Sequence, residues 1–97
     1  IGCGAIVNAE AIIGDNAIIN NGVIVEHEVK IGKNCHLAPG VMVGGRVLIG
    51  NNTFIGIGSS IADYINIGQD SIIGAGSVIV KNVKNNSTVV GVGRVLS

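Results

Sequence analysis

The sequence predicts an all-β protein, a parallel β-helix in which six-residue repeats form the sides of triangular coils. Every sixth residue from Ile1 to Ile79 is a branched aliphatic residue, fourteen in all, with no shift of phase. The residue four positions after each aliphatic, from Ala5 to Val83, is mostly small or β-branched. The residue directly after each aliphatic is Gly in eight cases. A strict period of six is typical of a parallel β-helix, since neither an α-helix nor a hairpin repeats in this way.

Each repeat is expected to form one flat side and one corner of a coil. Three sides per turn make a coil of 18 residues, so that residues 1–84 form between four and five coils. The aliphatic residue fills the interior, and the small residue four positions later packs near the turn. Gly relieves backbone crowding, because strands stack about 4.8 Å apart. A β-sandwich of alternating strands would not keep one phase through fourteen repeats.

Residues 85–97 depart from the repeat, and we expect them to fold back as a short C-terminal cap. The open end of a solenoid exposes its core, so that a chain of stacked repeats needs a terminal segment of this kind. The domain organisation expected is therefore a β-helix over residues 1–84 and a cap over residues 85–97.

The sixth residue of each repeat should point outward, and at intervals of 18 these residues form three columns. Two columns are mainly apolar and consist of Ile6, Ile24, Met42, Ser60 and Val78, and of Ile18, His36, Phe54 and Ile72. The third column is more polar and consists of Ile12, Lys30, Leu48, Asn66 and Lys84. A soluble monomer rarely exposes two apolar stripes. We therefore expect self-association, and a homotrimer buries both stripes most simply.

Composition argues against several other partners. Six Lys and Arg residues balance six Asp and Glu residues, which disfavours nucleic acid or an anionic membrane surface as the main partner. No apolar run approaches the roughly 20 residues that a membrane span needs. Cys3 and Cys35 are too far apart for a C-x-x-C site and are expected to be free thiols, which favours a cytoplasmic location.

Both histidines of the chain lie in the stretch VIVEHEVKIGKNCH, residues 23–36. His27 stands between Glu26 and Glu28, and an imidazole beside a carboxylate suits a general base, because it can take up a proton near neutral pH. Half of a metal site and a solvated corner are the alternatives for the same three residues. His36 falls within one of the apolar columns, which suits a hydrogen-bond donor at an interface.

Six-residue repeats of this kind resemble those of the left-handed β-helix acyltransferases, and the stretch NNGVIVEHEVKIGKNCHLAPG, residues 20–40, narrows the resemblance. Together with IGNNTFIGIGSSI (49–61) and IGAGSVIVKNV (73–83), it is most similar to the sialic acid O-acetyltransferase family, which includes bacterial nucleotide-aminosugar N-acetyltransferases. The most specific element is Asn-x-Gly-x-x-x-Glu-His-Glu, followed by the second histidine. The resemblance implies a left-handed coil and direct acetyl transfer from acetyl-CoA, without a metal, to the amino group of a nucleotide-linked amino sugar. O-acetylation of sialic acid or another sugar remains the close alternative.

The resemblance also implies roles for individual residues. His27 matches the general base, and Glu28 matches the acid that orients it and raises its basicity. The positions that match contacts to acetyl-CoA are His36, Gly45, Ile57 and Ala75, and those that match the acceptor pocket are Asn20 and Glu26. The groove is expected between adjacent subunits. Family members usually carry an N-terminal domain that holds the sugar nucleotide, and none lies within these 97 residues, so we expect an incomplete acceptor site.

Two readings from other classes are weaker. A carbonic-anhydrase-like metalloprotein on the same β-helix needs three histidines, and the chain has two. A non-catalytic trimerisation module would keep the apolar columns but would not bind acetyl-CoA.

Overall fold

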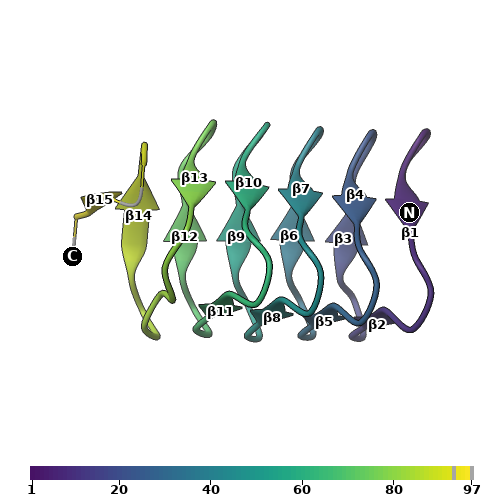
Figure 1. Cartoon of the computed structure of the whole chain (residues 1–97), viewed down its shortest axis with the longest axis horizontal. Coiled ribbons are helices and arrows are strands. Elements are labelled where there is room, and N and C mark those ends of the chain that lie inside the picture. Colours follow the sequence, from purple (N-terminus) through teal and green to yellow (C-terminus); the bar gives the residue numbers. More distant parts are fainter. Residues whose placement is uncertain (93, 97) are drawn as a thin grey trace.

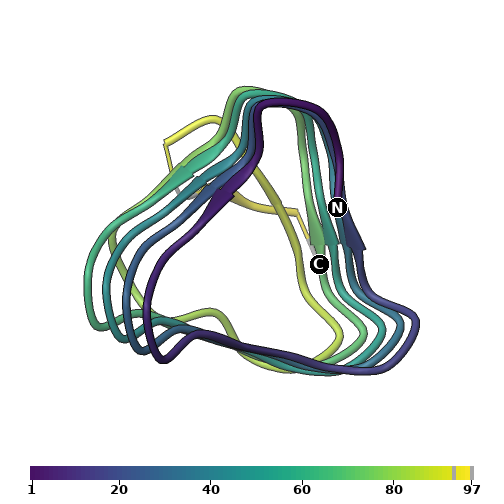
Figure 2. The same ribbon diagram turned by 90° about the vertical axis from the view of Figure 1, so that its right-hand side faces the viewer.

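The computed structural model describes residues 1–92 and 94–96, which form a triangular solenoid of short parallel strands (Figures 1 and 2). Seen from the N-terminal end, the chain turns anticlockwise as it recedes (Figure 2), so the coil is left-handed. The expected fold class, a left-handed parallel β-helix, is confirmed.

Three sheets form the sides of the triangle. Sheet A contains β1 (Ile6–Val7), β4 (Ile24–Val25), β7 (Met42–Val43), β10 (Ser60–Ile61) and β13 (Val78–Ile79). Sheet B contains β2 (Ile12–Ile13), β5 (Lys30–Ile31), β8 (Leu48–Ile49) and β11 (Asn66–Ile67). Sheet C contains β3 (Ile18–Ile19), β6 (His36–Leu37), β9 (Phe54–Ile55), β12 (Ile72–Ile73), β14 (Thr88–Val90) and β15 (Arg94–Val95).

The strands pair in the register that the period of six predicts. In sheet A, Ile6 lies beside Ile24, and Ile24 beside Met42, so that each residue pairs with the residue 18 positions on. The same offset holds from β2 to β11 and from β3 to β12, for example between His36 and Phe54. Side chains 18 residues apart are therefore neighbours along every face and every corner of the solenoid.

The interior is filled as the repeat predicts. From Ile19 to Ile79 the aliphatic positions are buried, for example Val25, Leu37 and Ile55, each 0% exposed, whereas Val7 and Ile13 are partly buried and Ile1 is exposed. The positions four residues later are buried from Val23 to Ser77, and the polar ones donate to backbone carbonyls: the Oγ1 of Thr53 donates to the carbonyl oxygen of Gly68, on the next coil, at 2.9 Å. Cys35 is also buried, and burial raises the pKa of its thiol. Cys3 is exposed.

The fourth residue of each repeat bends the chain at a corner with a positive φ. At one corner this residue is always Gly, as at Gly40 and Gly58, and at another it is Asn or Asp, which tolerate this conformation. The third corner carries Glu10, Glu28, Arg46 and Tyr64. A positive φ is uncommon for such residues.

The end of the chain departs from the period by two residues. Thr88 of β14 pairs with Ile72, an offset of 16 where the earlier coils have 18. The solenoid thus continues in sheet C beyond residue 84, and the chain reverses only after β14, where β15 pairs with it antiparallel.

Among the described residues, no helix has the length and apolar character to cross a membrane.

Crowding between coils gives a first testable prediction. Gly50→Ala is expected to destabilise the fold by about 1–3 kcal/mol through overpacking. The reason is that a Cβ on residue 50 would lie 2.4 Å from the backbone nitrogen of Gln69. Gly45 is the matched control, since a Cβ there would meet the carbonyl oxygen of His27 at an ordinary 3.7 Å. Guanidinium unfolding at one protein concentration measures both variants. Equal unfolding midpoints for Gly50→Ala and Gly45→Ala would contradict this account of the repeat.

Candidate functional site

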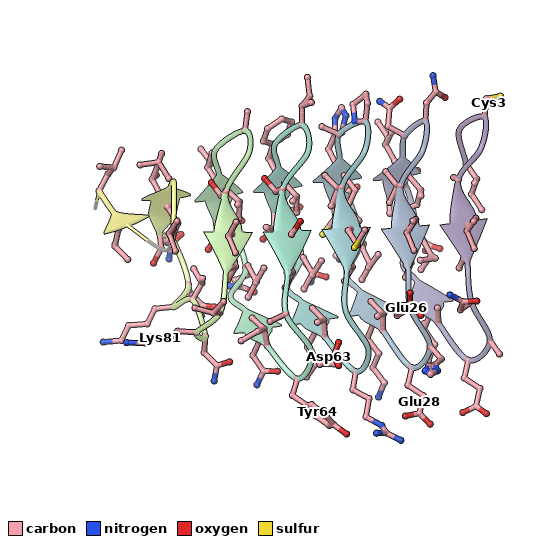
Figure 3. All side chains as sticks on the ribbon, turned by 45° about the horizontal axis from the view of Figure 1, so that its top comes forward. Cys3, Glu26, Glu28, Asp63, Tyr64 and Lys81 are labelled. Atoms are coloured by element: carbon pink, nitrogen blue, oxygen red, sulfur yellow. The ribbon has the colours of Figure 1, made fainter. Side chains whose placement is uncertain are left out.

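The three corners of the solenoid are named here by the sheets that they join. The A–B edge follows sheet A and includes residues 8–11, 26–29, 44–47, 62–65 and 80–82. The C–A edge precedes sheet A and includes residues 2–5, 20–23, 38–41, 56–59 and 74–77. The B–C edge is the remaining corner, between sheets B and C, and includes residues 14–17, 32–35, 50–53, 68–71 and 84–87. Figure 3 shows Glu26, Glu28, Asp63, Tyr64 and Lys81 along the A–B edge, and Cys3 at the C–A edge.

The predicted base lies in the turn between β4 and β5. His27 is exposed at this turn, whereas Glu26 and Glu28 are partly buried. The side-chain amide of Asn8 donates a hydrogen bond to Oε1 of Glu26 at 3.2 Å, from one coil earlier. The turn residue Glu28 has a φ of 61°. All three side chains therefore belong to one corner of the A–B edge.

The carboxylate of Glu28 is engaged by the next coil. Its Oε2 accepts a hydrogen bond from Nε of Arg46, which raises the pKa of the Arg46 guanidinium. Arg46 also donates to the hydroxyl of Tyr64 at 2.6 Å, and its Cζ lies 5.6 Å from the centre of the Tyr64 ring. Within the described part of the chain, the hydrogen bonds of Glu28 do not include one to His27. The role of Glu28 in orienting His27 stays a prediction.

Two adjoining hollows open beside His27. The smaller, about 110 Å³, is lined by His27, Glu28, Gly45, Arg46, Asp63 and Tyr64. The larger, about 330 Å³, is lined by Glu26, His27, Met42, Gly44, Gly45, Ile61 and Asp63. Gly45 lies between His27 and Asp63 in the same column of the edge. Because it carries no side chain, it leaves space between the imidazole and the carboxylate.

The other predicted contacts to acetyl-CoA lie elsewhere on the single chain. His36 projects from β6 of sheet C and is partly buried, with its ring packed edge-on against Phe54 at 5.2 Å between centres. Ile57 and Ala75 are exposed on successive coils of the C–A edge, where the amide of Gly76 donates to the carbonyl oxygen of Ile57 at 2.7 Å. Asn20 is partly buried on the same edge.

The structure thus brings together one half of the predicted site. Glu26, His27, Glu28 and Gly45 form one cluster on the A–B edge, and neither hollow beside His27 is lined by Asn20, His36, Ile57 or Ala75. The C–A edge lies at the other margin of sheet A (Figure 3). A single copy of the chain therefore does not unite the two groups.

Our sequence analysis missed three residues of the cluster, Arg46, Asp63 and Tyr64. A signal for them was present, because Arg46 and Tyr64 follow Glu28 at intervals of 18, and Asp63 follows His27 at twice that interval. For a metal, the described residues include no group of three His, Cys, Asp or Glu side chains suited to hold an ion.

Comparison with known proteins places the chain in a family. The sequence profile described as "Bacterial transferase hexapeptide (six repeats)" matches residues 10–45 and 46–81. No curated protein sequence matches the chain.

Three solved structures are similar to the chain. A variant of GDP-perosamine N-acetyltransferase from Caulobacter crescentus, in complex with CoA and GDP-perosamine, is 36% identical over 97% of this chain and 45% of that one, with a TM-score of 0.95. The serine acetyltransferase of Neisseria gonorrhoeae is 30% identical over 97% of this chain and 41% of that one, with a TM-score of 0.89. The acetyltransferase domain of PglB from the same organism is 31% identical over 94% of this chain and 47% of that one, with a TM-score of 0.69.

The chain spans less than half the length of each of these three proteins. The profile match covers most of the repeat, and the fold and its 18-residue register agree with it. The chain therefore belongs to the bacterial transferase hexapeptide family.

Proposed function

We propose that this chain is the acetyl-transferring part of an acetyl-CoA-dependent N-acetyltransferase whose acceptor is the amino group of a nucleotide-linked amino sugar. The observation that carries the proposal is the cleft beside His27, in a fold that superposes with a TM-score of 0.95 on an N-acetyltransferase holding CoA and GDP-perosamine. Histidine is the residue used most often for general base catalysis.

In the proposed reaction, the acceptor amine attacks the thioester carbonyl of acetyl-CoA. The new carbon–nitrogen bond leaves a positive charge on nitrogen and a negative charge on the carbonyl oxygen. His27 takes the proton from nitrogen, the carbon–sulfur bond breaks, and the proton passes to the departing thiolate. Such base catalysis contributes about 10²–10⁴-fold. A hydrogen-bond donor must meet the oxyanion, and the imidazole of His36 is our candidate for it.

We further propose that the active form is a homotrimer and that each site combines two copies of the chain. His27 lies on the A–B edge, whereas His36, Ile57 and Ala75 lie on sheet C and the C–A edge, so a second copy is needed to unite them. The outward columns of sheets A and C expose Ile6, Met42, Ile18 and Phe54 at 52%, 49%, 51% and 40%. Such apolar surface is typical of an interface. We place the protein in the cytoplasm, where thiols such as Cys3 and Cys35 stay reduced.

The proposal is tested on the complete enzyme by release of the CoA thiol from acetyl-CoA, with GDP-perosamine as the probe acceptor and mass spectrometry of the product. Acetylated nucleotide sugar is the expected result. Calorimetry with acetyl-CoA separates the enzyme from a non-catalytic trimerisation module, which would give no binding heat. Transfer to a hydroxyl in place of the amine would identify an O-acetyltransferase and overturn the proposed acceptor.

A bulky side chain on the C–A edge is expected to block the acetyl-CoA groove. Ala75→Phe should weaken acetyl-CoA binding at least 10-fold, because a clash that costs about 1.4 kcal/mol lowers the affinity about 10-fold. The oligomer should persist. Ala75→Gly is the control, because removing a methyl group from this exposed position leaves the groove open. Calorimetry of the two variants measures the difference. Unchanged affinity in Ala75→Phe would remove Ala75 from the groove.

A further inference from the structure

A capping hydrogen bond recurs at the corners of the solenoid. At four corners, an Asn or Asp side-chain oxygen accepts the backbone N–H of the corresponding corner residue one coil earlier. The four cases are Asn21 with Cys3 at 2.8 Å, and Asn51 with Lys33, Asp63 with Gly45 and Asn85 with Gln69, each at 2.9 Å. Three of these four caps are neutral amides, and Asn82 makes a similar bond to the N–H of Asn66 in β11 at 2.9 Å, so the cap itself needs no charge.

The charged cap is the one on the A–B edge. Asn21 lies on the C–A edge, and Asn51 and Asn85 lie on the B–C edge. Asp63 lies two coils beyond His27 in the same column and lines both hollows beside it, with Gly45 between them. Among these four corners, only the one that adjoins the predicted base carries a carboxylate in place of an amide.

The charge of Asp63 is not neutralised by its neighbours. Its Oδ1 accepts from Gly45, and the hydrogen bonds of the described residues include none to Oδ2. The guanidinium of Arg46 is engaged by Glu28 and Tyr64. Lys81 follows in the same column but extends toward the C-terminal end (Figure 3), and within residues 1–92 no ion pair joins it to Asp63. Among the described residues, the Asp63 carboxylate therefore lines both hollows without an ion-pair partner.

We propose that Asp63 selects an amine over a hydroxyl acceptor by placing its carboxylate against the amino group that lies over Gly45. This inference rests on the proposed function. An amine carries positive charge in its protonated form and again in the adduct, after its lone pair has formed the carbon–nitrogen bond and before His27 removes the proton. A nearby carboxylate stabilises both states. A hydroxyl acceptor is neutral when it binds and gains less.

The test is Asp63→Asn, which keeps the capping oxygen that Asn supplies at three other corners. Relative to the wild type, kcat/KM for GDP-perosamine is expected to fall about 10- to 100-fold, the range for losing a hydrogen bond to a charged group. The affinity for acetyl-CoA and the unfolding midpoint should stay the same. The nucleotide sugar with a hydroxyl in place of the amino group is assayed as an inhibitor. The wild type should bind the amine more tightly than this hydroxyl analogue, and the difference in affinity should largely disappear in Asp63→Asn.

The matched control is Asn51→Asp, which adds a carboxylate to a cap on the B–C edge and should leave the kinetics unchanged. An active wild type with an equally active and equally selective Asp63→Asn would overturn the inference while leaving the proposed function in place. If the wild-type enzyme binds acetyl-CoA but releases no thiol, the proposed function is refuted, and the role of Asp63 is refuted with it.

Discussion

His27→Ala is expected to lower the kcat of the complete enzyme by about 10²–10⁴-fold, the usual contribution of a general base. The affinity for acetyl-CoA should change little, because the proposed role of His27 is to take the proton of the acceptor and not to hold the donor. A loss in kcat with an equal loss in kcat/KM identifies an interaction made only in the transition state. Steady-state kinetics with GDP-perosamine, together with calorimetry of acetyl-CoA, measure the two quantities.

His36→Ala and Glu28→Gln are the comparisons for this experiment. His36→Ala should also weaken acetyl-CoA binding, because it removes a proposed contact to the donor. Glu28→Gln should cost less than His27→Ala, since the carboxylate is proposed to act only through the imidazole and its Oε2 accepts from Arg46. Near-normal kcat in His27→Ala, together with an inactive His36→Ala, would show that the roles of the two histidines are reversed.

Phe54→Asp is expected to dissociate the assembly. Phe54 is 40% exposed in the outward column of sheet C and packs against His36. At an interface, the substituted carboxylate would be buried without a partner, at a cost of several kcal/mol. Light scattering coupled to size-exclusion chromatography should give a trimer for the wild type and a monomer for the variant. Acetyl transfer should be lost with the trimer.

Leu48→Asp is the matched control for this variant. Leu48 is 42% exposed, nearly the same as Phe54, but it belongs to the outward column of sheet B, which carries Lys30 and Asn66 beside it. The trimer should therefore persist in Leu48→Asp. A monomeric wild type at micromolar concentration would refute the proposed assembly, and dissociation of both variants would show that the interface is not confined to sheets A and C.

The strand register could be predicted from the sequence because one residue type recurs at one spacing. A branched aliphatic at every sixth position can be buried only if each repeat forms one side of a coil, and this places Ile6 beside Ile24 and His36 beside Phe54. The period also separates inward from outward side chains, and Cys35 and Thr53, each four positions after an aliphatic residue, are buried. The handedness came from family resemblance, because spacing alone does not distinguish the two hands.

The end of the repeat was harder to place. Residues 85–97 break the period, yet Thr88 still pairs with Ile72 after a shortening of two residues. A backbone hydrogen bond does not require a particular side chain, so the sheet continues where the side-chain pattern has ended. The reversal of the chain into β15 depends on this pairing with β14.

By itself, the sequence determined the solenoid, its coil length, its apolar faces and the residues that resemble a catalytic site, because all of these follow from repeat and motif. The tertiary structure decided how those residues are distributed. It gathered Glu26, His27 and Gly45 at one edge with Asp63, and directed the carboxylate of Glu28 to Arg46. It left His36, Ile57 and Ala75 apart from them. The reason is that the period brings residues 18 apart to the same corner but does not specify the directions of their side chains. The contacts between them depend on those directions.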